Sequence, residues 1–203
     1  MISAAMAMFA LGQAMASPLL NIQDANDFQD PGFAKVAWSD SPNFNKRPND
    51  AVVDTVIIHS TVSPTLKGTV KWFGMPSAQV SAHFTIGKDG SIAQMVSTFD
   101  RAWHAGASTD HRGKSNLNNF TIGIELVNLN DGKDPYPKEQ VRSLRYLLKS
   151  LARRHPIKFL MSHEFIAEPQ GRKSDPKAFP WDDLKDLGFQ MLYGFKPKAP
   201  GTP

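Results

Sequence analysis

The chain has 203 residues, of which 41% are hydrophobic and 21% charged, so we expect one folded domain with a sizeable core. Its formal net charge of +4 is only mildly basic, without the dense Lys/Arg clusters of nucleic-acid binders, and we expect no nucleic-acid partner. The sequence contains no cysteine, which excludes disulfides, thiolate metal ligands and a cysteine nucleophile.

Residues 1–16 are predicted to be a signal peptide. The segment after Met1 carries no charge, and it ends in Ala14-Met15-Ala16, an A-x-A pattern that predicts cleavage before Ser17. The positive n-region of such peptides is missing, and the alternative is a gene-start artefact or a frayed apolar tail. The run is too short to span a membrane as a mature helix, and no later segment is a candidate. The signal peptide implies a periplasmic or secreted protein.

Residues 17–50 are rich in Asn, Asp, Pro and Ser, which indicates an extended arm with one short strand around residues 34–38. The main domain is expected over residues 51–190. Its first element is a β-branched run over residues 53–59, which predicts a buried strand. A short helix is expected over residues 66–73.

Residues 80–87 and 91–96 are predicted to be two strands joined by a tight turn at Asp89-Gly90. Residues 102–119 are rich in Gly, Ser, Asn and His and predict a long loop. The alternating segment over residues 120–127 predicts another buried strand.

One clear amphipathic helix is expected between Pro137 and Pro156, because apolar residues recur at three- and four-residue spacing at Val141, Leu144, Leu148 and Leu151. A short strand at residues 159–161, a short helix at residues 181–187 and a polar tail over residues 191–203 complete the chain. Strands interleaved with helices predict a single α/β domain whose mixed central sheet is flanked by helices.

The ends of the predicted strands carry residues that suit a metal. His59 ends the first buried strand, His163 follows the short apolar run near residue 160, and Asp175 lies 12 residues further on. Each alone has a plainer interpretation, a structural histidine or a turn aspartate. Together, two His and one carboxylate are sufficient to hold a catalytic zinc ion with one coordination position open. Lys173 lies two residues before Asp175 and could place positive charge beside that position.

Five short motifs then occur in one order: Ile57-Ile58-His59-Ser60-Thr61, Ser81-Ala82-His83-Phe84, Ala102-Trp103-His104-Ala105-Gly106, Ile122-Gly123-Ile124-Glu125-Leu126 and Gly171-Arg172-Lys173-Ser174-Asp175-Pro176. Together they resemble the zinc-dependent N-acetylmuramoyl-L-alanine amidases of the type-2, AmpD-like family, which share a fold with peptidoglycan recognition proteins. Residues 122–128 and 179–181 look most like the exported, periplasmic branch of that family.

The resemblance implies a role for each matching residue. It makes His59, His163 and Asp175 the Zn²⁺ ligands. Glu125 becomes the general base, although a glutamate facing solvent from a half-exposed strand is the alternative. Lys173 becomes the cation that stabilises the oxyanion, although a solvated surface lysine is the alternative.

Three further residues are expected at the substrate. The resemblance places His83 near the ligands or in the cleft wall, and Trp103 and His104 in the wall of the substrate groove. A Trp that only packs in the core is equally compatible with the sequence. The phage enzymes of the family have a catalytic tyrosine where this chain has Ala82, so more of the chemistry would depend on Glu125.

The resemblance also implies the reaction, which is cleavage of the amide between N-acetylmuramic acid and the L-alanine of the stem peptide. The partner would be peptidoglycan or a muropeptide, bound by a monomer. Two alternatives stay open: a peptidoglycan-binding module without catalysis, and a zinc carboxypeptidase or endopeptidase that acts on the stem peptide.

Overall fold

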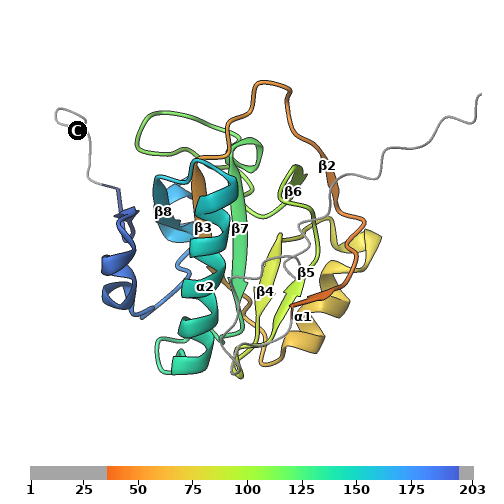
Figure 1. Cartoon of the computed structure of the whole chain (residues 1–203), viewed down its shortest axis with the longest axis vertical. Helices are drawn as coiled ribbons and strands as arrows, with labels where there is room; N and C mark the ends of the chain where they lie inside the picture. Colours follow the sequence, from red (N-terminus) through yellow and green to blue (C-terminus); the bar gives the residue numbers. More distant parts are fainter. Residues whose placement is uncertain (1–35, 197–203) are drawn as a thin grey trace, which may run out of the picture.

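The computed structural model describes residues 36–196 as a seven-stranded sheet with helices on both faces (Figure 1). The predicted signal peptide over residues 1–16 lies outside the described residues, as do most of the arm and the end of the tail. None of the helices within residues 36–196 is long and apolar enough to cross a membrane.

The strand order of the sheet is β1-β5-β4-β7-β3-β8-β9. Only the β4–β5 hairpin is antiparallel, and all other neighbours in this sheet are parallel, so the predicted mixed sheet is confirmed. The bounds are β1 (Val36–Trp38), β3 (Thr55–Ser60), β4 (Phe84–Ile86), β5 (Ile92–Gln94), β7 (Thr121–Leu126), β8 (Phe159–Ser162) and β9 (Gln190–Leu192).

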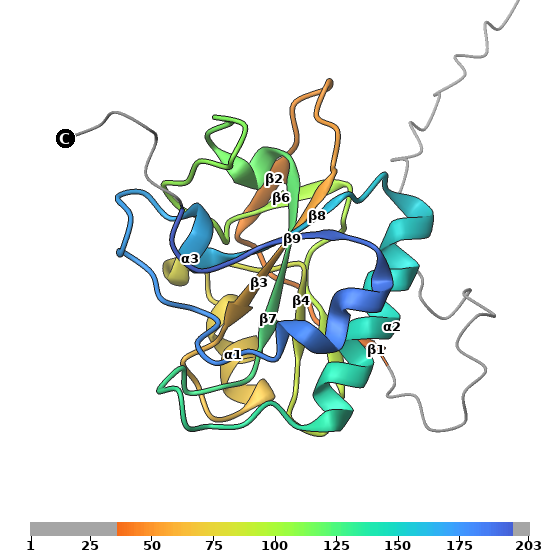
Figure 2. The same cartoon turned by 90° about the vertical axis from the view of Figure 1, so that its left-hand side faces the viewer.

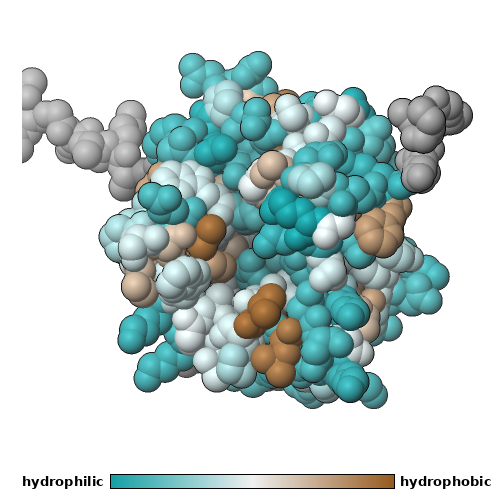
Figure 3. Space-filling view, turned by 180° about the vertical axis from the view of Figure 1, so that it is seen from behind, coloured by the Kyte–Doolittle hydropathy of each residue, from teal (hydrophilic) through white to brown (hydrophobic). Residues whose placement is uncertain are grey.

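One face of the sheet is covered by the long helix α2 (Lys138–Arg154) and the 3-10 helix η4 (Trp181–Leu187), as Figure 2 shows. α2 begins after Pro137 and ends before His155, within the span between Pro137 and Pro156 that the sequence predicts. Its apolar stripe packs on alternate residues of the central strands, and the shared core includes Val56, Ile58, Ile122, Ile124, Leu144, Leu147, Leu148 and Leu151. Seen from behind, turned by 180° from the view of Figure 1, the surface of the molecule is largely hydrophilic and shows small, separated apolar patches (Figure 3).

The other face carries α1 (Leu66–Phe73), the short helix α3 (His163–Ile166) and the loop of residues 103–120 that leads into β7. α1 begins where the Thr65 side chain accepts a hydrogen bond from the Gly68 N–H. Side chains alternate along a strand, so His59 and Glu125, each next to a residue of the α2 core, point to this second face. The candidate site therefore lies at the carboxyl ends of parallel strands, where open α/β sheets bind ligands.

Several short elements differ from the sequence prediction. β2 (Phe44–Lys46) of the arm pairs with β6 (Asp100–Ala102) in a separate two-stranded sheet, and β1 pairs with the sheet edge at β5. β9, α3 and the 3-10 helices η2 (Pro76–Ala78) and η3 (Leu117–Asn119) were not expected, and the final helix is 3-10 rather than α. Elements of three or four residues are too short to show a periodicity in sequence.

Candidate metal centre and active site

The three predicted metal ligands come from three neighbouring chain segments. His59 is near the end of β3, and His163 follows the adjacent strand β8 as the first residue of α3. Ser162 fixes that start because its hydroxyl accepts a hydrogen bond from the Phe165 N–H at 2.9 Å. The loop that carries Asp175 is held there by a hydrogen bond from the Glu164 N–H to the Asp175 carbonyl at 2.9 Å.

The ligand atoms of these residues converge on one point. His59 Nδ1 lies 3.0 Å from His163 Nδ1, His163 Nδ1 lies 3.1 Å from Asp175 Oδ2, and His59 Nδ1 lies 3.6 Å from the same oxygen. Metal–ligand bonds of about 2.0–2.1 Å in a tetrahedron separate the ligand atoms by about 3.3 Å. All three side chains are buried. The donor set and its spacing therefore fit a zinc ion with three protein ligands.

Contacts around the three ligands prepare them for a cation. His163 Nε2 lies 3.3 Å from the Ala105 carbonyl, which can only accept, so the proton is on Nε2 and the Nδ1 lone pair faces Asp175. Asp175 Oδ2 also accepts from the Ser60 N–H at 3.3 Å.

Electrostatics favour the charge states that a metal needs. Burial would raise the pKa of Asp175, but the neighbouring His163 and His59 imidazoles outweigh it and hold that pKa well below its usual range. Burial, together with the charge of His163, lowers the pKa of His59 to about 4. The site thus offers one carboxylate and a neutral imidazole at neutral pH.

Glu125 lies beside the predicted metal ligands. It faces His59 across the β3–β7 pair, and its Oε2 atom is buried with no hydrogen-bond partner among the described residues. Burial, followed by the charge of Asp175, raises the pKa of Glu125 to about 8, and Lys173 opposes this shift. A carboxyl group that exchanges a proton near neutral pH and points into a pocket suits general acid–base chemistry.

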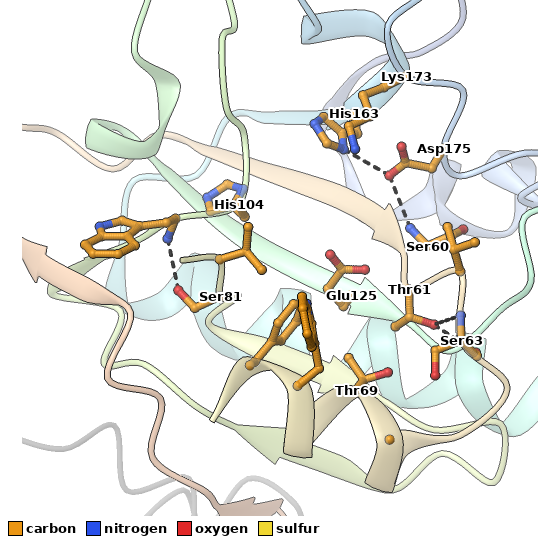
Figure 4. A pocket seen from close by; sticks show the side chains of 16 residues that line it. Ser60, Thr61, Ser63, Thr69, Ser81, His104, Glu125, His163, Lys173 and Asp175 are labelled. Carbon is orange, nitrogen blue, oxygen red and sulfur yellow. Dashed lines mark hydrogen bonds and ion pairs between the residues drawn. The ribbon is translucent and has the colours of Figure 1, made fainter. Parts of the chain in front are cut away.

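Most of these groups line one pocket of about 460 Å³ (Figure 4), although the buried His59 is not among its lining residues. His163, Asp175, Glu125 and the exposed Lys173 lie on one side of it, and α1 lines another side with Trp72 and further residues. Trp103 and His104 also line it, and the Trp103 indole N–H donates to Asn45 Oδ1 at 3.0 Å. One pocket is therefore lined both by four predicted metal-ligand or catalytic residues and by the two residues predicted for the wall of the substrate groove.

His83 is predicted to lie near the ligands or in the cleft wall, and the structure places it outside the pocket lining, with its ring centroid 5.7 Å from that of His104. His83 is fully buried. Its Nδ1 accepts from the Gly123 N–H at 3.0 Å, and its Nε2 lies 3.0 Å from Arg47 Nη2 and 3.1 Å from the Asp100 carbonyl. His83 joins β4, β7 and the arm. A histidine inside a strand gives no sequence signal that separates this role from a cleft role.

Sequence reasoning missed other residues that hold the site. Tyr136 Oη lies 2.7 Å from Ser60 Oγ and 3.3 Å from the Lys177 carbonyl, which ties the metal-ligand loop to β3. Asn118 Oδ1 accepts from the backbone N–H groups of His104 and Ala105 at 3.1 and 2.8 Å. Tyr136 and Asn118 both lie in segments without a regular sequence pattern, so their roles could not be predicted from the sequence.

Comparison with known proteins identifies the family. The family profile described as N-acetylmuramoyl-L-alanine amidase matches residues 48–178. The chain belongs to this family. The 1,6-anhydro-N-acetylmuramyl-L-alanine amidase AmpD of Citrobacter freundii is 32% identical over 168 residues, covering 72% of this chain and 87% of that protein. N-acetylmuramoyl-L-alanine amidase A of Achromobacter lyticus is 28% identical over 176 residues, covering 76% and 94%.

Solved structures of this family have the same fold. A crystal structure of a selenomethionine AmpD derivative has a TM-score of 0.62 at 29% identity and covers 78% of this chain and 97% of that one. The Escherichia coli amidase AmiD, solved with anhydro-N-acetylmuramic acid-L-Ala-D-γ-Glu-L-Lys, has a TM-score of 0.61 at 30% identity, covering 71% and 62%. A Drosophila peptidoglycan recognition protein, with a TM-score of 0.57 and 14% identity, shares the fold alone.

Proposed function

We propose that this member of the amidase family is a zinc hydrolase that cleaves the amide between N-acetylmuramic acid and L-alanine. The observation that carries the proposal is the convergence of His59 Nδ1, His163 Nδ1 and Asp175 Oδ2 at 3.0–3.6 Å. Glu125, whose Oε2 has no hydrogen-bond partner among the described residues, lines the same pocket as His163 and Asp175.

The residues around that point divide the chemistry between them. Zinc, when bound, supplies a Lewis acid that polarises a carbonyl and lowers the pKa of water. Glu125 takes the proton of the attacking water and delivers it to the leaving amine. Lys173 places its ammonium group in the pocket, where it stabilises the negative charge that develops on the carbonyl oxygen. Ala82 is buried and leaves no tyrosine at that position to share the proton transfer.

The substrate proposed is a muropeptide or intact peptidoglycan. The Citrobacter relative is named for the 1,6-anhydro sugar, and the AmiD structure holds an anhydro-muramyl tripeptide. A pocket with Trp72 and Trp103 in its walls offers aromatic faces for a sugar or a peptide stem. All three ligands are present in a suitable geometry, which argues against a binding module without catalysis.

Digestion of purified cell wall, with products identified by mass, tests this function. We expect muramyl sugar released from peptides that begin with L-alanine, loss of the activity in chelator, and its return with zinc. Loss of D-alanine with the sugar still attached would instead indicate the stem-peptide peptidase. Wall binding without any cleavage would indicate the binding module.

Export, the domain limits and the oligomeric state belong to the same proposal. We infer a catalytic domain over residues 51–190 that acts outside the cytoplasm, because residues 1–16 have the composition of a signal peptide. A monomer is in keeping with the small, separated apolar patches of the face in Figure 3.

A further inference from the structure

We propose that His104 is a positioning residue that holds His59 in the one neutral tautomer able to bind a cation through Nδ1. The inference rests on the proposed metal centre. It gives His104 a different role from the substrate contact that the sequence led us to expect.

The direction of each hydrogen bond follows from a carbonyl at the far end of the network. The Leu117 carbonyl can only accept, and it lies 2.8 Å from Thr121 Oγ1, so the threonine hydroxyl donates its proton there. Thr121 Oγ1 therefore accepts from His104 Nε2, 3.2 Å away. A neutral imidazole carries one N–H, so His104 Nδ1 accepts from His59 Nε2 at 3.0 Å.

With its proton on Nε2, His59 presents a lone pair at Nδ1. That lone pair faces His163 Nδ1 and the Asp175 carboxylate, and His163 is in the same tautomer because its Nε2 faces the Ala105 carbonyl. Two lone pairs and a carboxylate at these distances repel one another in the absence of a cation. The tautomer that His104 selects is therefore the one that a metal requires.

The surroundings of His104 hold its ring in place. Its backbone N–H is fixed by Asn118 Oδ1, and its side chain packs edge-on against His59 with ring centroids 5.1 Å apart. The ring also lies directly over Gly123, where a Cβ atom would come within 2.4 Å of the His104 Cγ. His104 is only 9% exposed, so little of the ring is available to a substrate.

A matched pair of variants separates this role from a substrate contact. The carboxamide in His104→Asn lies near the position of Nδ1 and can accept from His59. The carboxamide in His104→Gln reaches towards the position of Nε2, donates to Thr121, and leaves His59 Nε2 without an acceptor. We expect His104→Gln to weaken zinc binding by about 10- to 100-fold and His104→Asn to stay within about threefold of wild type. The zinc dissociation constant is measured by competition with a chromogenic chelator.

A second readout reports the tautomer itself. In ¹⁵N spectra of the zinc-free protein, where no metal fixes the tautomer, His59 should carry its proton on Nε2 in the wild type and in His104→Asn, and should lose this preference in His104→Gln. Unchanged zinc affinity in both variants with a raised KM would make His104 a substrate contact and overturn the proposal. An equal loss of zinc affinity in both variants would show that the His104 ring only packs against its neighbours, and it would also overturn the proposal.

Thr121 provides the same test if the His104 variants do not fold. Thr121→Val removes the acceptor for His104 Nε2, whereas Thr121→Ser retains it, so zinc binding should weaken in the valine variant alone. Equal affinity in the two would contradict the proposal. A wild-type protein that binds no zinc at all would instead refute the proposed function, and the two failures are thereby distinguishable.

Discussion

Glu125 is the residue whose chemistry depends most on its surroundings. We expect Glu125→Gln to keep zinc and lower turnover by about 10²- to 10⁴-fold, because an amide of the same shape cannot carry the proton. Atomic emission measures the zinc content, and the release of peptides that begin with L-alanine measures the turnover. Glu164→Gln is a matched control, because burial and Asp175 also raise the pKa of Glu164, yet it does not line the pocket. Loss of zinc from Glu125→Gln would contradict its assignment as a base.

Lys173 is exposed and lies in the same pocket. Lys173→Ala should lower kcat by about 10²- to 10³-fold if its charge stabilises the oxyanion. Lys177→Ala removes an exposed lysine of the same loop that lies outside the pocket, and it should retain wild-type kcat. Steady-state kinetics on one muropeptide compare the two. Equal rates for both variants would leave Lys173 as a surface charge.

Single residues could be predicted from sequence where the chemistry leaves few options. With no cysteine available, two histidines near strand ends and a loop aspartate predict a candidate metal centre, and the family resemblance adds Glu125 and Lys173. His83 could not be placed, because a buried structural histidine and a cleft histidine have the same sequence context. The role of Tyr136 depends on a contact with Ser60 that is 76 residues away in the chain.

At the scale of elements, β7 accommodates the His104 ring by having glycine at position 123. Gly123→Ala should cost about 1–3 kcal/mol of unfolding free energy, because the new Cβ would overlap the ring. In a His104→Ala background the same substitution should cost much less. Urea denaturation of the four proteins gives the coupling free energy. If the changes in unfolding free energy of the two single variants were additive in the double variant, the His104 ring and residue 123 would not be in contact.

The contact between the end of α2 and the loop before β6 should make stability depend on pH. Burial, then the charges of Arg47 and Arg154, lowers the pKa of His155 to about 4, and its Nε2 lies 2.9 Å from Thr98 Oγ1. An unfolded histidine has a pKa of about 6.5, so the unfolded state binds more protons between pH 6.5 and 4. The contribution of neutral His155 to the free energy of unfolding is therefore fully present above pH 6.5 and is lost as the pH falls towards 4.

The variant His155→Gln isolates this contribution. When the pH falls from 6.5 to 4, the free energy of unfolding should decrease by about 1–2 kcal/mol less in His155→Gln than in the wild type, after allowance for partial solvent screening. Urea denaturation at both pH values measures the difference. Other buried histidines titrate in both proteins, so only the difference between the two is informative. Identical pH dependence would contradict the lowered pKa.

Elements with a clear pattern could be predicted, and the shortest could not. The apolar stripe of α2 is long enough to show its period, and the continuous β-branched run of β3 is typical of a strand buried on both faces. β2 and β6 have three residues each and form only because distant segments meet. The whole molecule follows from the longer elements, since alternating strands and helices already imply the layered α/β arrangement.

In the whole molecule, strands and loops from distant parts of the sequence bring His59, His163 and Asp175 to within 3.0–3.6 Å of one another, and the proposed function requires one ion to bind between them. The most direct measurement is a crystal structure of the zinc-loaded protein, with anomalous data collected on both sides of the zinc absorption edge. We predict one strong anomalous peak in contact with His59 Nδ1, His163 Nδ1 and Asp175 Oδ2. Zinc bound elsewhere, or no peak between these three atoms in an active protein, would contradict the account.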